Sequence, residues 1–207
     1  MKMYRRKYFC ICEGQQEKMY LSHLSSLLNQ SRQKTVTFEC VVGNISKYKK
    51  SYKEYDYVGV FDYDFKEKEF LGNIEQCNKE DKIFQKSRKA EKKRFYHAYS
   101  NINFDLWLIL HKEDFRKTHR TNDAYIADVK RIFNILSDSI KSKKDMKAIL
   151  KAITLEDVKN AIIRAENIRK AKEDCDIIGN KEYIVYDNPD FSIHLFLKRV
   201  LQDSGDW

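Results

Sequence analysis

Two short apolar runs that each stop at acidic residues constrain the fold of this chain more than any other feature. Residues 8–12 have the composition of a buried strand, Glu13 follows them directly, and Gly14 begins a turn into a helix. Residues 58–61 have the same character and are followed by Asp62 and Asp64. Residues two apart in an extended segment point to the same side, so we expect the two aspartates to face one point. If the two strands are parallel neighbours, all three carboxylates meet at one end of a sheet.

Carboxylates crowded in this way repel one another unless a cation lies between them, and their oxygens suit Mg²⁺ or Mn²⁺. A metal ion at such an edge orients a phosphodiester, polarises its oxygens and activates water, and a second ion stabilises the leaving oxygen. We therefore expect Glu13, Asp62 and Asp64 to be catalytic residues and metal ligands, with Glu13 also placed to act as general base or acid. Glu17, one helical turn after Glu13, is expected to be an auxiliary ligand. The competing interpretation is that these acids only cap helices.

The spacing of apolar residues predicts an α/β fold. Strands are expected at residues 4–12, 35–42, 55–61 and 95–100, with helices between them at 15–30 and 65–84. This alternation predicts a mainly parallel sheet flanked by helices.

The second half of the chain is expected to be helical. A buried helix is predicted at 104–111, followed by helices at 122–137, 143–152 and 154–174, a loop at 175–189, and a last helix opened by Asn188-Pro189 that ends near residue 201. We therefore expect a core at residues 1–112 and a helical extension at 113–207 packed on it.

The charge balance favours a polyanionic partner. Lys and Arg number 40 against 31 for Asp and Glu, a net charge of +9, which favours nucleic acid above other partners. The densest basic cluster is expected to contact phosphates, and its members are Lys86, Arg88, Lys89, Lys92, Lys93 and Arg94. Weaker candidates lie at 47–53, 112–120 and 141–147. Runs of charge are also typical of a solvated surface.

Cysteine usage and hydropathy indicate a cytoplasmic protein. The five cysteines are scattered, without a Cys-x-x-Cys pair or Cys/His ligand spacing, so a structural zinc site is not expected. No apolar stretch has the length of a signal peptide or membrane span, so no membrane association is expected.

Four blocks of the sequence resemble a known family. Glu13-Gly14-x-x-Glu17, together with Asp62-x-Asp64, resembles the Toprim pattern of primases, topoisomerases, old-family nucleases and the small ribonuclease that matures ribosomal RNA. Residues 100–111 (SNINFDLWLILH) are similar to the Ser-Asn-Pro-x-Phe-Glu-x-Trp-Leu-Leu-Leu-His block of the RloB-like family. Residues 188–194 (NPDFSIH) resemble that family's Asn-Pro-Ser-Thr-x-Val-His. The blocks keep the family's order from Tyr8 to about Leu201.

The resemblance implies a Toprim-like core with a C-terminal helical extension and a nuclease that uses Mg²⁺ or Mn²⁺, as two ions. It implies a toxic effector of anti-phage defence that acts with an ABC-type ATPase on RNA, transfer RNA included, and it is compatible with a homodimer. Asn101 and Asp105 are four residues apart and would share a face of a helix, which places Asp105 near the metals and Asn101 at the mouth of the helix against phosphate. The alternative for the second block is structural, with Ser100 or Asn101 as an N-cap and Trp107 in the core. His111 and His194 are expected to be packing residues.

The chain departs from the family at several positions. Gln16 stands where the family usually has Thr, Tyr63 where it has Arg, Asp105 where it has Glu, and Ile102 or Asn103 where it has Pro. The loss of the Arg removes a cation between the two aspartates. A primase or topoisomerase is not expected, since the chain shows no room for the second domain of those enzymes. The alternative function is a non-catalytic, basic nucleic-acid-binding subunit of a defence complex, for which metal binding through Asp62 and Asp64 is not expected.

Overall fold

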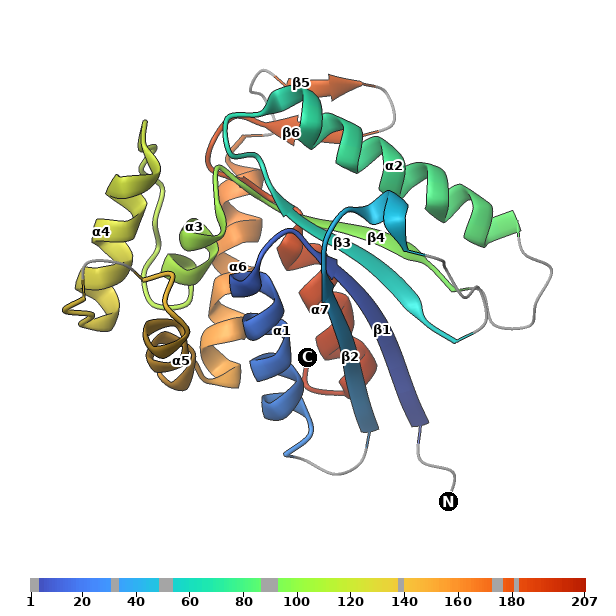
Figure 1. Cartoon of the computed structure of the whole chain (residues 1–207), viewed down its shortest axis with the longest axis horizontal. Helices are drawn as coiled ribbons and strands as arrows, with labels where there is room; N and C mark the ends of the chain where they lie inside the picture. The colour runs from blue at the N-terminus through green and yellow to red at the C-terminus, as the bar shows by residue number, and fades with distance from the viewer. Residues whose placement is uncertain are drawn as a thin grey trace.

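The computed structural model describes residues 4–30, 34–48, 54–86, 93–137, 140–172, 177–180 and 183–207. A twisted central sheet has helices on both faces (Figure 1). Its strands are β1 (Tyr4–Cys12), β2 (Lys34–Val42), β3 (Asp56–Asp62), β4 (Phe95–Asn101) and β7 (Asp190–Phe191), in the order β2-β1-β3-β4-β7. The first four are mutually parallel and β7 is antiparallel to β4. The predicted α/β fold with a mainly parallel sheet is confirmed.

Each face of the sheet has its own apolar core, because side chains alternate along the strands. Tyr8 and Cys10 of β1 pack with α1 (Gln15–Leu28) and α7 (Ile193–Ser204). Ile11 packs with α2 (Glu67–Lys86) and the 3₁₀ turn η1 (Ile45–Lys47) on the opposite face. The turn η1 and helix α2 approach β3 so closely that a Cβ at Gly59 would lie 2.7 Å from Ile45 Cδ1 and 2.8 Å from Cys77 Sγ. Any larger residue at this point of the buried strand would have to displace the ends of both side chains.

Four helices of the second half of the chain lie on the side of the sheet that α1 covers. They are α3 (Phe104–Leu110), α4 (Asn122–Phe133), α5 (Lys143–Lys151) and α6 (Leu155–Lys170), seen together on the left of Figure 1. Trp107 of α3 is fully buried in this core, as predicted. Thr154 caps α6 and forms a reciprocal capping box with Asp157. Within the described part of the chain, no helix has the length and apolar character needed to cross a membrane.

The second half is not wholly helical, which corrects one expectation. The segment predicted as a loop contains an antiparallel hairpin of β5 (Ile177–Asn180) and β6 (Tyr183–Tyr186), and β7 then joins the main sheet. The last helix begins at Ile193, four residues after Pro189. The strand β7 was not predicted because its first residue is an acid, Asp190, and an apolar pattern is what marks a buried strand. Asp190 is buried, and its side chain accepts a 2.7 Å hydrogen bond from Tyr99 Oη. The boundary at residue 112 stays a prediction, although β7 and α7 complete the sheet and its cover.

Candidate functional site

The strand order reverses between β1 and β3. From β1 the chain passes through α1 to β2 on one side of β1, whereas β3 lies on its other side and leads through α2 to β4. Ligands of open α/β sheets bind at the carboxyl ends of the strands, at such a switch point. Glu13 follows β1 and Asp62 ends β3, so the first two predicted site residues lie at this point.

Glu13 and Asp62 are joined directly. The backbone N–H of Glu13 donates to Val60 O at 2.9 Å, which continues the β1–β3 ladder by one residue. The side chain of Glu13 then turns back, and its Oε2 accepts the backbone N–H of Asp62 at 3.0 Å. One carboxylate oxygen of Glu13 is thereby fixed at the strand end, and Oε1 is left for other partners.

Asp62 and Asp64 do not follow one extended strand, and the predicted geometry is wrong at this point. The strand ends at Asp62, and Asp64 and Phe65 adopt left-handed backbone angles, with φ of 48° and 57°. Such angles are uncommon for residues other than glycine and mark local strain that tends to collect at functional sites. Asp64 nevertheless stays at the sheet edge, because its N–H donates to Ile102 O at 2.9 Å and its Oδ1 accepts from Asn122 Nδ2 at 3.1 Å. Asp62 Oδ2 accepts the backbone N–H of Phe104, at the start of α3, at 3.0 Å.

Glu17 and Asp105 complete the acidic group from α1 and α3. Both are 4% exposed. Glu17 Oε2 accepts the backbone N–H of Gly14 at 2.9 Å, and Asp105 Oδ1 accepts from Gln16 Nε2 at 3.3 Å. The last contact joins two of the positions at which the chain departs from the family pattern: a longer Gln reaches a shorter acid.

The five acids act on one another electrostatically. Burial, with a smaller contribution from the charges of Glu13 and Asp105, raises the pKa of Glu17 to about 7, although backbone hydrogen bonds such as that from Gly14 act in the opposite direction. Burial likewise raises the pKa of Asp62 well above its usual range, and Glu17 and Glu13 contribute to this shift.

The same forces act at the two ends of the group. Glu13 is exposed as a residue, but partial desolvation of its carboxyl group raises its pKa. The charges of Asp64 and Glu69 also raise it. Burial raises the pKa of Asp105 to about 6, with Gln16 and Lys141 acting in the opposite direction. These shifts mark a cluster of negative charge that Lys66 and Lys141 offset only in part.

The donors that hold the five carboxylates are neutral. All are backbone or side-chain amides, and within the described residues no Lys, Arg or His forms an ion pair with any of the five. In the same described ranges no three Asp, Glu, His or Cys side chains are arranged to hold one metal ion. Carboxylate oxygens have the right chemistry for Mg²⁺ or Mn²⁺. To bind an ion here, the side chains of the five acids would have to turn their free oxygens towards it.

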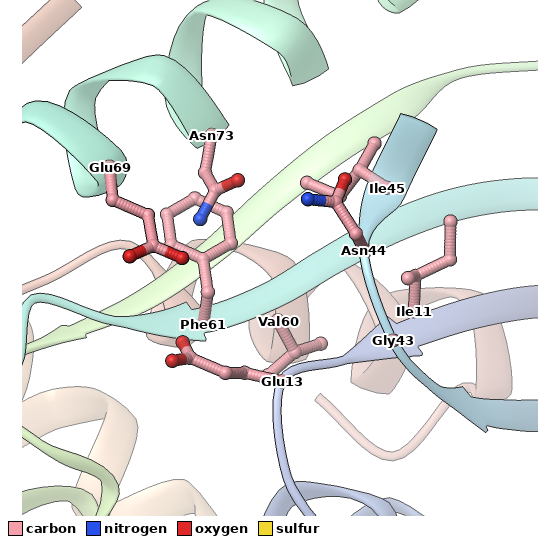
Figure 2. A pocket seen from close by; sticks show the side chains of 9 residues that line it. All are labelled: Ile11, Glu13, Gly43, Asn44, Ile45, Val60, Phe61, Glu69 and Asn73. Atoms are coloured by element: carbon pink, nitrogen blue, oxygen red, sulfur yellow. The ribbon is translucent and has the colours of Figure 1, made fainter. Parts of the chain in front are cut away.

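Two further residues near Glu13, Glu69 and Asn73, were not predicted from the sequence. Figure 2 shows Glu69 and Asn73 of α2 reaching down towards Glu13 across a cavity of about 130 Å³. Asn44 lines its other side, after β2. Glu69 and Asn73 are four residues apart and so share a helix face. That spacing, shortly after the Asp-x-Asp segment, is the only pattern in the sequence that points to them.

Comparison with known proteins decides the family. The sequence model of the RloB-like protein family matches residues 8–199. The chain belongs to the RloB-like family. Searches of curated proteins and of solved structures found no match.

The matched range contains every candidate site residue. Within the block at 100–111, most of the polar residues form hydrogen bonds that hold the fold together. Asn101 is the last residue of β4 and not part of a helix, and its Nδ2 donates to Tyr186 O at 3.2 Å. Asn103 is the N-cap of α3, through a hydrogen bond from Leu106 N, so neither Ser100 nor Asn101 has that role. His111 is buried between Trp107 O and Tyr20 Oη, and burial lowers its pKa to about 4.

The last block of the family match also belongs to the core. Ser192 accepts the N–H of Tyr99 at 3.0 Å and contacts His97 Nδ1 at 2.9 Å, which fastens the start of α7 to β4. His194 is 2% exposed. Both histidines predicted as packing residues are therefore buried.

The described residues of the predicted basic cluster lie far from the acidic group. Lys86 ends α2, and Lys93 and Arg94 precede β4. They therefore lie at the amino-terminal end of β4, opposite the end at which the acids gather (Figure 1). Lys93 is 8% exposed, and Arg94 binds Asp81 with both Nε and Nη2, at 2.9 and 2.8 Å. Arg88, Lys89 and Lys92 lie outside the described residues.

Proposed function

We propose that this RloB-like protein is a divalent-metal-dependent nuclease that cleaves phosphodiester bonds of RNA. The observation that carries the proposal is the acidic group at the switch point between β1 and β3. It consists of Glu13, Glu17, Asp62, Asp64 and Asp105. Burial and the neighbouring acids raise the pKa values of Glu13, Glu17, Asp62 and Asp105, and no cationic side chain of the described residues forms an ion pair with the group. Burying uncompensated carboxylates together is costly, and proteins keep such groups where they bind cations.

The roles of the five acids follow from their places. Asp62 and Asp64, with Glu17 and Asp105 behind them, would hold one or two Mg²⁺ or Mn²⁺ ions. A bound ion would supply Lewis-acid polarisation of the phosphate and a more acidic water. Glu13 is the most accessible of the group, and its Oε1 is the oxygen free to take up or release a proton beside the phosphate.

The substrate and partner are proposed on the resemblance. RNA is preferred, transfer RNA included, and the net charge of +9 agrees with a polyanionic substrate. A nuclease that acts on cellular RNA is toxic, so we propose that an ABC-type ATPase restrains it and that release serves anti-phage defence, within the cytoplasm.

A second function is kept for a specific reason. Asp62 binds the first amide of α3, and Glu17 binds the backbone before α1, so both acids have structural partners without any metal. A non-catalytic RNA-binding subunit would need no more than these roles. Metal binding separates the two functions.

The test is a cleavage assay on the purified protein, alone and with an ABC-type ATPase encoded beside its gene. Labelled RNA is incubated with Mg²⁺, with Mn²⁺ or with EDTA. We expect metal-dependent fragments from the wild type and none from Glu13→Gln or Asp62→Asn, whereas the exposed Glu67→Gln serves as the matched control. Absence of cleavage with both metals, with and without the ATPase, contradicts the proposal.

A further inference from the structure

A cleft between α1 and α5 is lined by lysine side chains. It has a volume of about 770 Å³, within the range of ligand sites in proteins. Five lysines lie around it, two from α1 and the turn before α5 and three from α5: Lys18, Lys141, Lys143, Lys147 and Lys151. Among the described residues no Asp or Glu lines it. The ammonium groups of Lys18, Lys143, Lys147 and Lys151 repel one another and attract an anion with several charges.

The lysines are set in rows by helix geometry. Lys143, Lys147 and Lys151 are four residues apart and fall on one face of α5, about 6 Å from one to the next along the axis. This interval is on the scale of successive phosphates in an extended nucleic acid strand. All three are exposed. A row of this kind fits a polymer of phosphates better than a single small anion.

The floor of the cleft is apolar. Met19 of α1 is half-buried and Leu150 of α5 is 5% exposed, and both line the cleft. His23 forms a third part of the lining and is held by a 3.0 Å contact with Ile153 O. An apolar floor beneath a cationic rim lets unpaired bases cover apolar side chains while their phosphates lie among the lysines. A cleft of about 770 Å³ has room for a short stretch of single strand.

The cleft opens next to the acidic group. Gln15 and Lys18, which line it, flank Gln16 and Glu17 in the first turns of α1. Lys141 lines it too and is near enough to Asp105 for its charge to act on that carboxyl group. The same helix therefore presents acids at the sheet edge and lysines along the cleft.

We propose that the α1–α5 cleft binds the phosphate backbone of a single-stranded segment of RNA and leads that strand to the acidic group. The inference deepens the proposed nuclease function and rests on it for the fate of the strand. Binding itself needs neither metal nor cleavage. The contacts are to phosphates, so they do not depend on base sequence.

The test measures binding of fluorescein-labelled single-stranded RNA by anisotropy in EDTA, which removes cleavage from the readout. The variant combines Lys143→Ala, Lys147→Ala and Lys151→Ala. Its control combines Lys68→Ala, Lys79→Ala and Lys82→Ala, three exposed lysines of α2 on the other face of the sheet. Both triple variants lower the net charge equally and place alanine, the best helix former, in a helix. Circular dichroism checks that both are folded.

We expect the α5 variant to bind roughly tenfold or more weakly, with the slope of log K against log salt reduced by about 2, as three lost contacts to a single strand require. The loss should be the same for oligonucleotides of different sequence, and the α2 variant should bind like the wild type. A duplex of equal length should compete poorly.

Three results overturn the inference: an α5 variant that binds like the wild type, an equal loss in the α2 variant, or equal competition by duplex or by polyglutamate. The two proposals fail separately. Intact α5-dependent binding without any metal-dependent cleavage contradicts only the nuclease. Cleavage that needs Glu13 but is unchanged in the α5 variant contradicts only the cleft.

Discussion

The carboxylate of Glu13 accepts a hydrogen bond from the backbone N–H of Asp62, with 3.0 Å between Glu13 Oε2 and the nitrogen. This bond ties the ends of β1 and β3 together where the strand order reverses. It orients Glu13 along the acidic edge, with its second oxygen free, and places the carboxyl group of Asp62 against α3. The two residues predicted from separate strand ends are thus one structural unit.

Mutual repulsion within the acidic group should make it a source of instability in metal-free protein. We expect Asp62→Asn to raise the free energy of unfolding in EDTA by about 1 kcal/mol, because it removes a charge and keeps an acceptor for Phe104 N. The melting temperature should rise by about 2–4 °C. Differential scanning calorimetry in EDTA measures this.

The control for this prediction is Glu67→Gln, an exposed acid in the first turn of α2, which should leave the melting temperature unchanged or slightly lower. Destabilisation by Asp62→Asn in EDTA would indicate that Asp62 serves mainly to cap α3.

The contact between Gln16 and Asp105 should make two departures from the family pattern interdependent. Gln16→Thr alone leaves a short side chain facing a short acid, and Asp105→Glu alone forces a longer acid against Gln16. We expect each single change to lower the free energy of unfolding and the double change to restore part of it, with a coupling of about 0.5–3 kcal/mol. Urea unfolding of the four proteins gives the cycle. Additive effects would show that the 3.3 Å contact contributes nothing.

Buried and exposed ion pairs should differ sharply in their contribution to stability. Arg6 Nε lies 2.7 Å from Oδ2 of Asp56, which is fully buried at the start of β3 and also accepts Arg94 N. Asp56→Ala removes the nearer acid partner of Arg6, which keeps Asp203 at 3.4 Å, and takes the acceptor from Arg94 N, so it should cost about 3 kcal/mol.

The matched change is Asp114→Ala, in an exposed pair with Arg116, and should cost no more than about 1 kcal/mol. Denaturant unfolding of both variants measures the difference. A cost below about 1 kcal/mol for Asp56→Ala would mean that water reaches this edge of the sheet.

The sequence predicted those parts of the site that are coded locally. A buried strand that stops at an acid is visible in the residues around Glu13 and Asp62, and the parallel sheet then brings the two together. Glu69 was missed because an exposed acid on a helix looks like any solvated face, and only the packing of α2 over β3 turns it towards Glu13 (Figure 2).

The basic cluster was expected near the acids because the two are close in the sequence. Arg94 directly precedes β4, but the seven residues of that strand separate it from the acidic edge by roughly 20 Å, at about 3.3 Å per residue. The hairpin and β7 were missed for a different reason. Asp190 is stabilised by Tyr99 and by a 3.1 Å ion pair with Arg169, partners 91 and 21 positions away that no local pattern reveals.

Burial of His194 should make stability depend on pH. Burial lowers the pKa of His194 to about 3, and the unfolded value is about 6.5, so the unfolded chain binds the proton more readily. This contribution to stability is complete above about pH 6.5 and is lost towards pH 3, by at most about 1.4 kcal/mol per pH unit.

The matching variant is His194→Leu, which removes the titrating group and keeps an apolar side chain in the core. Its stability relative to the wild type should improve between about pH 7 and pH 5, as measured by urea unfolding. Parallel pH curves for the two proteins would contradict the assignment of His194 as a neutral buried residue.

Calorimetric titration of Mn²⁺ into the metal-free protein tests the central claim most directly, because it measures the acidic group without assuming a substrate. We predict binding of one or two ions to the wild type and to Glu67→Gln, and a loss of at least about 10–100-fold in affinity for Asp62→Asn. The absence of Mn²⁺ and Mg²⁺ binding, or binding unchanged in Asp62→Asn, would contradict a metal-dependent nuclease and leave the acids as caps of α1 and α3.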